Sequence, residues 1–331
     1  MSNKKSFNLF DWYFKGSKES DKLDINVLEK PNLSNFFKVL WKKLNKLLSA
    51  NILFVFGNFP IIFLLIAISG IFSHSASAPL YHTWGPLQGA MMFEDNASTG
   101  FLTSIFGLHT EVNVINLSTK IFFGLGLLIV FTLGFTKIGT SYIYRNIMNG
   151  EAVFPFSDFF YVVKRNLKQG LVIGIIDIAF IGMFIYNIYF LWTNYNASKM
   201  NSVMLFFTIA MLIIYSFARN YAYIMVFTFD LKIKHIIKNS LFFTILGIKR
   251  NLMGLLGVIV VVLINYGLFI LFIPIGAILP FIITFSICDF IGVYSAYPII
   301  LKYMVSDEDR MHLIYKTYDA CCNEESNVAE D

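Results

Sequence analysis

The chain alternates between long apolar runs and shorter segments that carry most of its charge. A helix needs about 20 apolar residues to cross the hydrocarbon core of a bilayer, because it rises about 1.5 Å per residue. The pattern therefore predicts an all-α fold, a polytopic membrane helix bundle with six transmembrane helices. The predicted spans lie at about residues 51–72, 118–143, 169–192, 202–229, 251–273 and 281–301.

The remaining segments divide the chain into three parts. Residues 1–47 are rich in lysine, and apolar residues at helical spacing from Phe36 to Leu48 predict a basic amphipathic helix on the membrane surface. Residues 48–305 form the predicted transmembrane domain, with an external loop at 73–118 that contains no Lys or Arg. Residues 306–331 end in an acidic run, which predicts a disordered tail.

The basic residues indicate how the spans are oriented. Nearly all of them lie before the first span, in 144–168, in 230–250, or from Lys302 onward. The other loops carry only Lys199, with Lys120 at the start of the second span. Cytoplasmic loops of membrane proteins are enriched in Lys and Arg. We therefore expect a multi-pass protein of the plasma membrane with both termini in the cytoplasm.

Composition agrees with this class and argues against several functions. Hydrophobic residues make up 56% and charged residues only 14%, whereas a soluble domain is about a quarter charged. The net charge of +5 does not indicate a nucleic-acid partner, because the basic residues are concentrated in particular loops between the predicted spans. No catalytic motif, phosphate loop or metal-ligand spacing occurs in the sequence. We expect a protein that is not an enzyme and that needs no cofactor or metal.

The stretch from Thr136 to Leu171 is the most informative part of the chain. Asn149-Gly150 indicates a turn, and Pro155 suits the first turn of a new helix. This short helix is predicted to have an aromatic face and a basic side, and it leads directly into the third span. Its candidate contact residues are Phe156, Phe159, Phe160, Lys164 and Arg165. Two interpretations remain open, an elbow at the lipid headgroups or a docking helix for a cytoplasmic partner.

A short motif occurs twice and predicts an internal repeat. Two phenylalanines followed by the tetrapeptide KRNL occur at 159–167 and again at 242–252. Each copy follows a span directed inward and precedes a span directed outward. Spans two and three are therefore predicted to be related to spans four and five as parallel repeats.

Charged residues inside the predicted spans are candidates for a polar network. These residues are Asp177, Arg219 and Asp289. Asp177 and Arg219 lie at matching depths, so we predict that they pair, whereas Asp289 is expected near Asn187 and Asn265. Lys137 is expected to extend toward the inner surface. A charge in mid-membrane is costly, so the three residues either form a proton or substrate path or hold the helices in register.

The first predicted span is interrupted by Gly57-Asn58-Phe59-Pro60. Pro60 has no N–H with which to bond the carbonyl of Phe56, so a kink is expected there. Asn58 and the free carbonyl either line a polar site or are satisfied by neighbouring helices.

Several segments together resemble the YesL-like family of bacterial integral membrane proteins, domain of unknown function 624. The matching positions in the first span are Asn51, Leu53, Phe54, Pro60 and Ile61. Those around the first turn are Thr136, Gly139, Tyr142, Tyr144, Arg145, Gly150 and Glu151. Those of the following helix are Asp158, Phe159, Phe160, Lys164, Asn166, Lys168 and Gln169. The loop at 73–118 is longer than is typical of that family.

The resemblance implies a non-enzymatic accessory or regulatory component of a carbohydrate ABC-transport or sensing system. Its partners, besides the lipid bilayer, would be an ABC-transporter permease or ATPase, or a sensor kinase, with the 154–169 helix as the contact. The alternative is a transporter or channel in its own right, using Asp177, Arg219 and Asp289. That alternative requires a cavity at those residues. The sequence does not indicate the substrate or the oligomeric state.

Overall fold

The computed structural model describes residues 31–72, 74–79, 109–114 and 116–305. The predicted disorder of the 306–331 tail lies outside these residues, as do the first thirty residues and most of the 73–118 loop. The chain forms two compact units. One contains residues 1–58 and 130–331, and the other contains residues 59–129.

Within the described residues, five helical stretches are long and apolar enough to cross a membrane. They are Leu117–Asn149, Leu167–Thr193, Lys199–Thr228, Ile248–Leu271 and Ile273–Met304. The helices α4 (Leu44–Gly57) and α5 (Pro60–Ile68) reach this length only if they are counted together as one broken span. The described residues therefore contain five candidate membrane spans, or six if the broken pair is counted as one span. This is the helical membrane class that the hydropathy pattern predicts.

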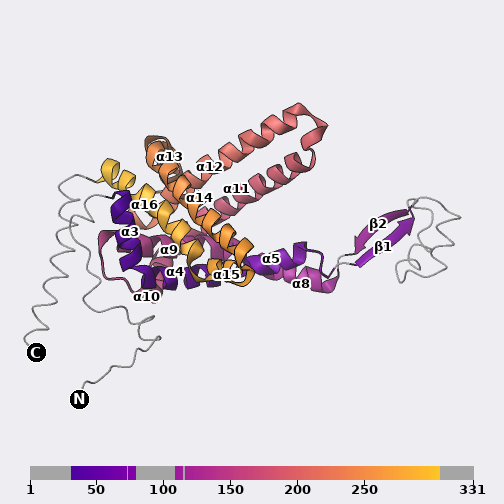
Figure 1. Ribbon diagram of the computed structural model, residues 1–331, viewed down its shortest axis with the longest axis horizontal. Helices are drawn as coiled ribbons and strands as arrows, with labels where there is room; N and C mark the ends of the chain where they lie inside the picture. The colour runs from indigo at the N-terminus through magenta and orange to yellow at the C-terminus, as the bar shows by residue number, and fades with distance from the viewer. Residues whose placement is uncertain (1–30, 73, 80–108, 115, 306–331) are drawn as a thin grey trace, which may run out of the picture. The chain divides into compact units, whose positions relative to one another are not determined.

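In the larger unit, α11 (Leu167–Thr193) and α12 (Lys199–Thr228) form a long hairpin closed by the turn η3 (Tyr195–Ala197) (Figure 1). Helix α12 also packs on α16 (Phe285–Met304), and α16 packs on α14 (Ile248–Leu271). The remaining span of this unit is α9 (Ile129–Asn149), which belongs to the first of the five stretches.

Helices α9 and α11 approach each other through glycines. A Cβ on Gly134 would lie 2.4 Å from the carbonyl oxygen of Gly170 and 2.8 Å from the Cα of Gly174. Gly170 and Gly174 are four residues apart on α11, which is the small-xxx-small spacing that allows close helix contact in membranes. Only glycine fits at this crossing.

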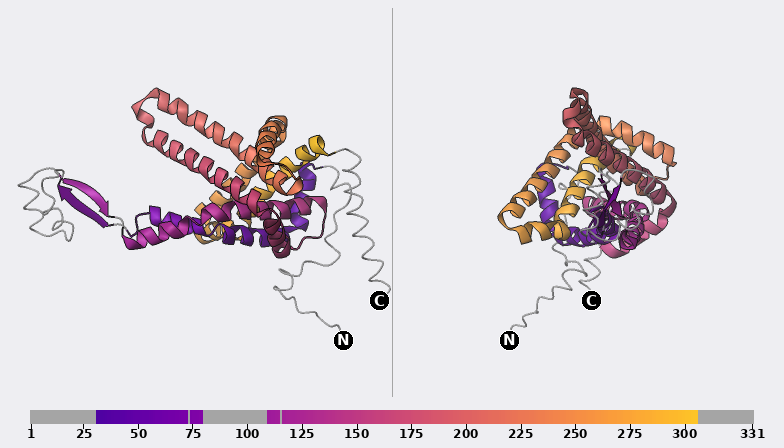
Figure 2. Two further views of the ribbon diagram at one scale, coloured as in Figure 1. Left: turned by 180° about the vertical axis from the view of Figure 1, so that it is seen from behind. Right: turned by 90° about the vertical axis from the view of Figure 1, so that its right-hand side faces the viewer.

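Three helices of the larger unit are each directly preceded by a short helix (Figure 2). These short helices are α3 (Leu33–Lys42), α10 (Pro155–Arg165) and α13 (Ile233–Leu246), and they lead into α4, α11 and α14. A single residue separates the two helices in each case: Lys43, Asn166 or Gly247. The amphipathic helix predicted from Phe36 to Leu48 is present as α3 up to Lys42, where it buries Phe36 and Val39, but the residues from Leu44 onward belong to α4.

The junction between the last two spans differs from the prediction. Residues 274–280, which lie between the predicted fifth and sixth spans and are expected to form a turn, are helical: α15 (Ile273–Leu279) and the π-helical segment η4 (Pro280–Thr284) continue into α16. Only Phe272 separates this run from α14. Pro274 lies in the first turn of α15, where its missing N–H has no helical acceptor. Pro280 instead lies inside the helical run, at the point where the run widens into the π-helical segment η4.

The smaller unit contains α5, α8 (Leu117–Gly126) and a two-stranded antiparallel sheet. Phe122 of α8 stacks on Phe72 with ring centroids 5.3 Å apart, and a Cβ on Gly126 would lie 2.9 Å from the backbone of Leu64. The strands β1 (His74–Pro79) and β2 (His109–Val114) pair His74 with Val114. The predicted loop at 73–118 therefore contains a strand pair, which the sequence analysis did not predict because the pairing depends on a contact distant in sequence.

Candidate functional site

Asp177 of α11 is the centre of a buried hydrogen-bond network. Its side chain is 2% exposed. Oδ2 accepts hydrogen bonds from Nε of Arg219 at 2.6 Å and from the hydroxyl of Tyr223 at 2.7 Å. Oδ1 accepts one from the hydroxyl of Tyr215 at 2.8 Å. The three donors recur every four residues on one face of α12, and the predicted Asp177–Arg219 pair is confirmed.

A second ion pair joins α9 to α16. Nζ of Lys137 donates to Oδ1 of Asp289, and the two side chains are 5% and 11% exposed. The hydroxyl oxygen of Thr140 lies 3.4 Å from the other carboxylate oxygen of Asp289. Lys137 is one turn from Thr140 on α9, so both face the same carboxylate.

Two predictions about these residues are wrong. Lys137 does not extend toward the inner surface, because its amine is neutralised inside the bundle by Asp289. Asp289 does not pair with Asn265, whose amide lies 3.4 Å from the carbonyl of Gly276 where α14 meets α15. Asn187 makes no hydrogen bond with another described residue through its side chain. Depth along a span was a correct guide for Asp177 but gave no information on which face of a helix Asp289 occupies.

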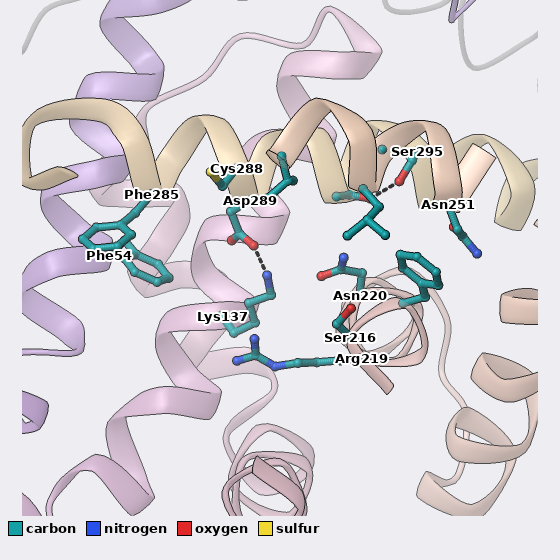
Figure 3. A pocket seen from close by; sticks show the side chains of 15 residues that line it. Phe54, Lys137, Ser216, Arg219, Asn220, Asn251, Phe285, Cys288, Asp289 and Ser295 are labelled. Atoms are coloured by element: carbon teal, nitrogen blue, oxygen red, sulfur yellow. Dashed lines mark hydrogen bonds and ion pairs between the residues drawn. The ribbon is translucent and has the colours of Figure 1, made fainter. Parts of the chain in front are cut away.

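The Lys137–Asp289 pair and Arg219 line a cavity of about 300 Å³ (Figure 3). Lys137 is close enough to Arg219 and Asp177 for their charges to act on it. The charged residues of the wall are Lys137, Arg219 and Asp289, and Asn220, Asn251, Ser216 and Ser295 add polar atoms. The apolar part of the wall includes Phe54, Phe217, Leu255, Val258 and Phe285. The cavity is thus a mixed polar and apolar site within the membrane-spanning helices.

Several polar groups at this cavity are already bonded to the protein. The hydroxyls of Ser216 and Ser295 donate to carbonyls of their own helices, at 2.7 and 2.9 Å. The Asn251 side chain accepts from Tyr221 at 2.9 Å and donates to the carbonyl of Thr244 at 3.1 Å. By contrast, the Asn220 amide and the two terminal nitrogens of Arg219 have no hydrogen-bond partner among the described residues.

Asn51 connects α4 to the segment that carries Asp289. Its Nδ2 donates to the carbonyls of Pro280 and Phe281, at 3.1 and 2.7 Å, and its Oδ1 accepts from the N–H of Ser286 at 2.8 Å. These bonds satisfy backbone groups that the wide turn of η4 leaves without a regular α-helical partner. Asn51 therefore helps to determine where α16 presents Asp289 to Lys137.

The candidate docking residues of α10 separate into two groups. Phe159 is buried, and its ring fills the space where a Cβ on Gly139 would lie. Arg165 donates to the carbonyl of Phe227 at 2.9 Å. Phe156 is partly buried against the core. Phe160, Lys164 and Arg165 are exposed, and of these three Arg165 is held against α12 by its hydrogen bond to Phe227.

The predicted break in the first span is present, since α4 ends at Gly57 and α5 begins at Pro60. Nδ2 of Asn58 donates to the carbonyl of Phe54 at 2.9 Å, which closes the end of α4. Its Oδ1 is buried without a hydrogen-bond partner among the described residues. These residues also contain no group of three or more His, Cys, Asp or Glu side chains arranged to hold a metal ion.

The fold and the site define a multi-span helical membrane protein with ion pairs buried beside a cavity of mixed polar and apolar lining. The family model DUF624, described as a protein of unknown function, matches residues 102–188. This region includes Lys137, Asp177 and α10, and the match supports membership of that family. No curated protein and no solved structure matches the chain.

Proposed function

We propose that this protein binds a small solute between its membrane-spanning helices and acts as a transporter or channel. The observation that carries the proposal is the cavity of about 300 Å³ walled by Lys137, Arg219 and Asp289. A volume of this size holds a small organic molecule. Charged groups inside a membrane are costly, and they commonly mark a substrate or ion path.

A solute screen with cavity-filling variants tests this function. The purified full-length protein in detergent is heated with sugars, organic acids and amines, and a bound solute raises its apparent melting temperature. Gly292→Val should abolish each stabilisation, because its Cβ would lie 2.6 Å from Nδ2 of Asn220 in the cavity wall. Gly267→Val is the control, since no atom lies within 4 Å of a Cβ there. If no solute stabilises the protein, or if stabilisation survives Gly292→Val, the proposal is wrong.

The second candidate function is an accessory or regulatory component beside a carbohydrate ABC transporter or a sensor kinase. The exposed side chains of Phe160, Tyr161 and Lys164 on α10 favour it, because they present an aromatic and basic surface. The double variant Phe160→Ser/Lys164→Glu should release such a permease, ATPase or kinase from affinity-purified membranes. Phe242→Ser, at an exposed position of α13, should not. Recovery of none of these partners with the unaltered protein would contradict this candidate.

The orientation and the repeat belong to the same proposal. We propose a YesL-like protein of a bacterial plasma membrane, with both termini in the cytoplasm. The distribution of Lys and Arg supports this orientation. A cysteine introduced at Ser98 in a cysteine-free variant should react with an impermeant maleimide added to intact cells. Labelling only after lysis would reverse the proposed topology.

The parallel repeat is supported by the arginine of each KRNL motif. Arg165 donates to the carbonyl of Phe227 on α12, and Arg250 lies 3.2 Å from the carbonyl of Tyr294 on α16. Each arginine thus lies at or next to the start of one span and contacts a backbone carbonyl of the span that follows it. The short helices α10 and α13 precede the two motifs in the same way.

A further inference from the structure

We infer that the ligand of the cavity is a small organic anion whose carboxylate binds the free guanidinium nitrogens of Arg219 beside Lys137. The inference rests on the proposed solute-binding function and specifies the ligand. It depends on three features of the wall: its charges, its unused hydrogen-bond donors and its apolar surface.

The charges that face the cavity do not balance. Lys137, Arg219 and Asp289 line it, which makes two positive groups and one negative group. Asp177, which balances Arg219, is not part of the wall and lies at the Nε side of the guanidinium. Arg219 repels Lys137 and Asp177 attracts it from outside the wall, so the four charges together are neutral while the two cations predominate at the cavity. In a medium of low dielectric constant, a bound anion interacts strongly with these two cations.

The unused donors suit a carboxylate. Arg219 uses only Nε for Asp177, so its two terminal nitrogens remain without an acceptor among the described residues. Its side chain is 26% exposed, and Figure 3 shows the guanidinium next to Lys137. A guanidinium presents its N–H groups in a planar fork that matches a carboxylate. The Asn220 amide, which contacts Gly292, supplies a further donor from the same wall.

The apolar surface argues for an organic anion over an inorganic one. Phe54, Phe217 and Phe285 line the cavity with Leu255 and Val258. A small inorganic ion at Arg219 would leave this surface without a partner, whereas an aromatic or aliphatic carboxylate would cover it. The ligand class is therefore a monocarboxylate with an apolar body. It reaches the site either dissolved in water or, as a fatty acid, from the bilayer.

Three isosteric probes test the charge requirement on the full-length protein in detergent. Benzoate is an anion, benzamide is neutral and benzamidine is a cation. We expect benzoate to raise the apparent melting temperature, and the other two to bind at least about tenfold more weakly. Competition between benzoate and oleate distinguishes the two sources: displacement by oleate indicates a ligand that also enters from the bilayer, and its absence indicates a dissolved one.

Two variants locate the binding. Asp177→Asn/Arg219→Gln removes both charges of the buried pair together, and it should weaken benzoate binding by at least about tenfold. Lys199→Gln, at the exposed first residue of α12, should not weaken it. Should the double variant fail to fold, Gly292→Val tests the same site by filling it while the charges are kept.

The outcomes separate the ligand class from the function. If benzamide or benzamidine stabilises the protein as well as benzoate does, and Gly292→Val abolishes the effect, the cavity binds solutes but the anion inference is wrong. If benzoate stabilises the unaltered protein, Asp177→Asn/Arg219→Gln and Gly292→Val equally, the anion binds elsewhere and the inference is also wrong. If no probe shifts the melting temperature, both the inference and the solute-binding function are contradicted.

Discussion

Lys137 of α9 and Asp289 of α16 lie 152 residues apart in the sequence, and they form an ion pair between two spans. The Asp177–Arg219 pair of α11 and α12 lies close enough for its charges to act on Lys137. The four formal charges sum to zero. A neutral set of paired charges is the form in which ionised side chains are tolerated inside a membrane, and here it connects four helices.

Removing one member of the Lys137–Asp289 pair should destabilise the protein, whereas replacing both members by apolar residues should not. Lys137→Met leaves the Asp289 carboxylate buried without its cation, and we expect a loss of about 3 kcal/mol or more in the free energy of unfolding. Lys137→Met/Asp289→Leu should recover most of that loss, because no uncompensated charge remains. The measurement is the apparent melting temperature in detergent for wild type, both single variants and the double variant. Additive losses in the double variant would show that the two side chains act independently.

The tyrosines around Asp177 should contribute unequally. Tyr223 is fully buried, so Tyr223→Phe removes a hydrogen bond that water cannot replace, and we expect a loss of about 1 to 3 kcal/mol. Tyr215 is only partly buried, so Tyr215→Phe should cost less. Tyr186→Phe, at an exposed position of α11, is the control. Equal unfolding midpoints for all three variants would contradict this network.

The glycine crossing of α9 and α11 should tolerate no side chain. Gly174→Ala places a Cβ 2.8 Å from the Cα of Gly134, so the two helices must move apart. We expect a loss of about 1 to 3 kcal/mol, because added methyl groups strain a well-packed contact. Gly182→Ala lies two turns further along α11 and meets nothing within 4 Å, so it should be neutral or slightly stabilising. Comparable melting temperatures for the two variants would rule out the close crossing.

The carboxylate of Asp158 should make the stability of the protein depend on pH. Burial raises the pKa of Asp158 in α10, although the N–H of Phe154, which donates to the carboxylate at 2.9 Å, opposes this shift. The folded protein therefore holds the proton more tightly than the unfolded chain. This contribution is present below the ordinary carboxyl pKa and is lost as the pH rises through the raised value of the folded state.

A comparison with Asp158→Asn isolates that effect, since the amide cannot titrate and its oxygen can still accept from Phe154. The stability of wild type relative to this variant should fall as the pH rises from about 4 to about 6. Chemical unfolding at each pH gives the difference. A relative stability that increases over this range would mean that the pKa of Asp158 is lowered in the folded protein.

Helix α10 shows which structural features local sequence can predict and which it cannot. Proline at position 155 and the spacing of the aromatic residues predict α10 correctly, because capping and periodicity are local properties. The same pattern does not reveal that Phe159 turns inward to Gly139 while Phe160 stays exposed. That distinction depends on which side of α10 meets α9, and only packing decides it.

The charged cluster shows the same division. Apolar run length identifies the helical membrane-spanning class, and matching depth predicts that Asp177 meets Arg219, because both properties follow from position along a span. The pairing of Lys137 with Asp289 depends on the rotation of α9 and α16 about their own axes. The placement of α16 depends in turn on Asn51 and the π-helical turn. The lengths of the apolar runs thus identify which residues lie in helices long enough to span a membrane. Which of those residues meet around a cavity could not be predicted from them, because contacts between distant helices are set by packing.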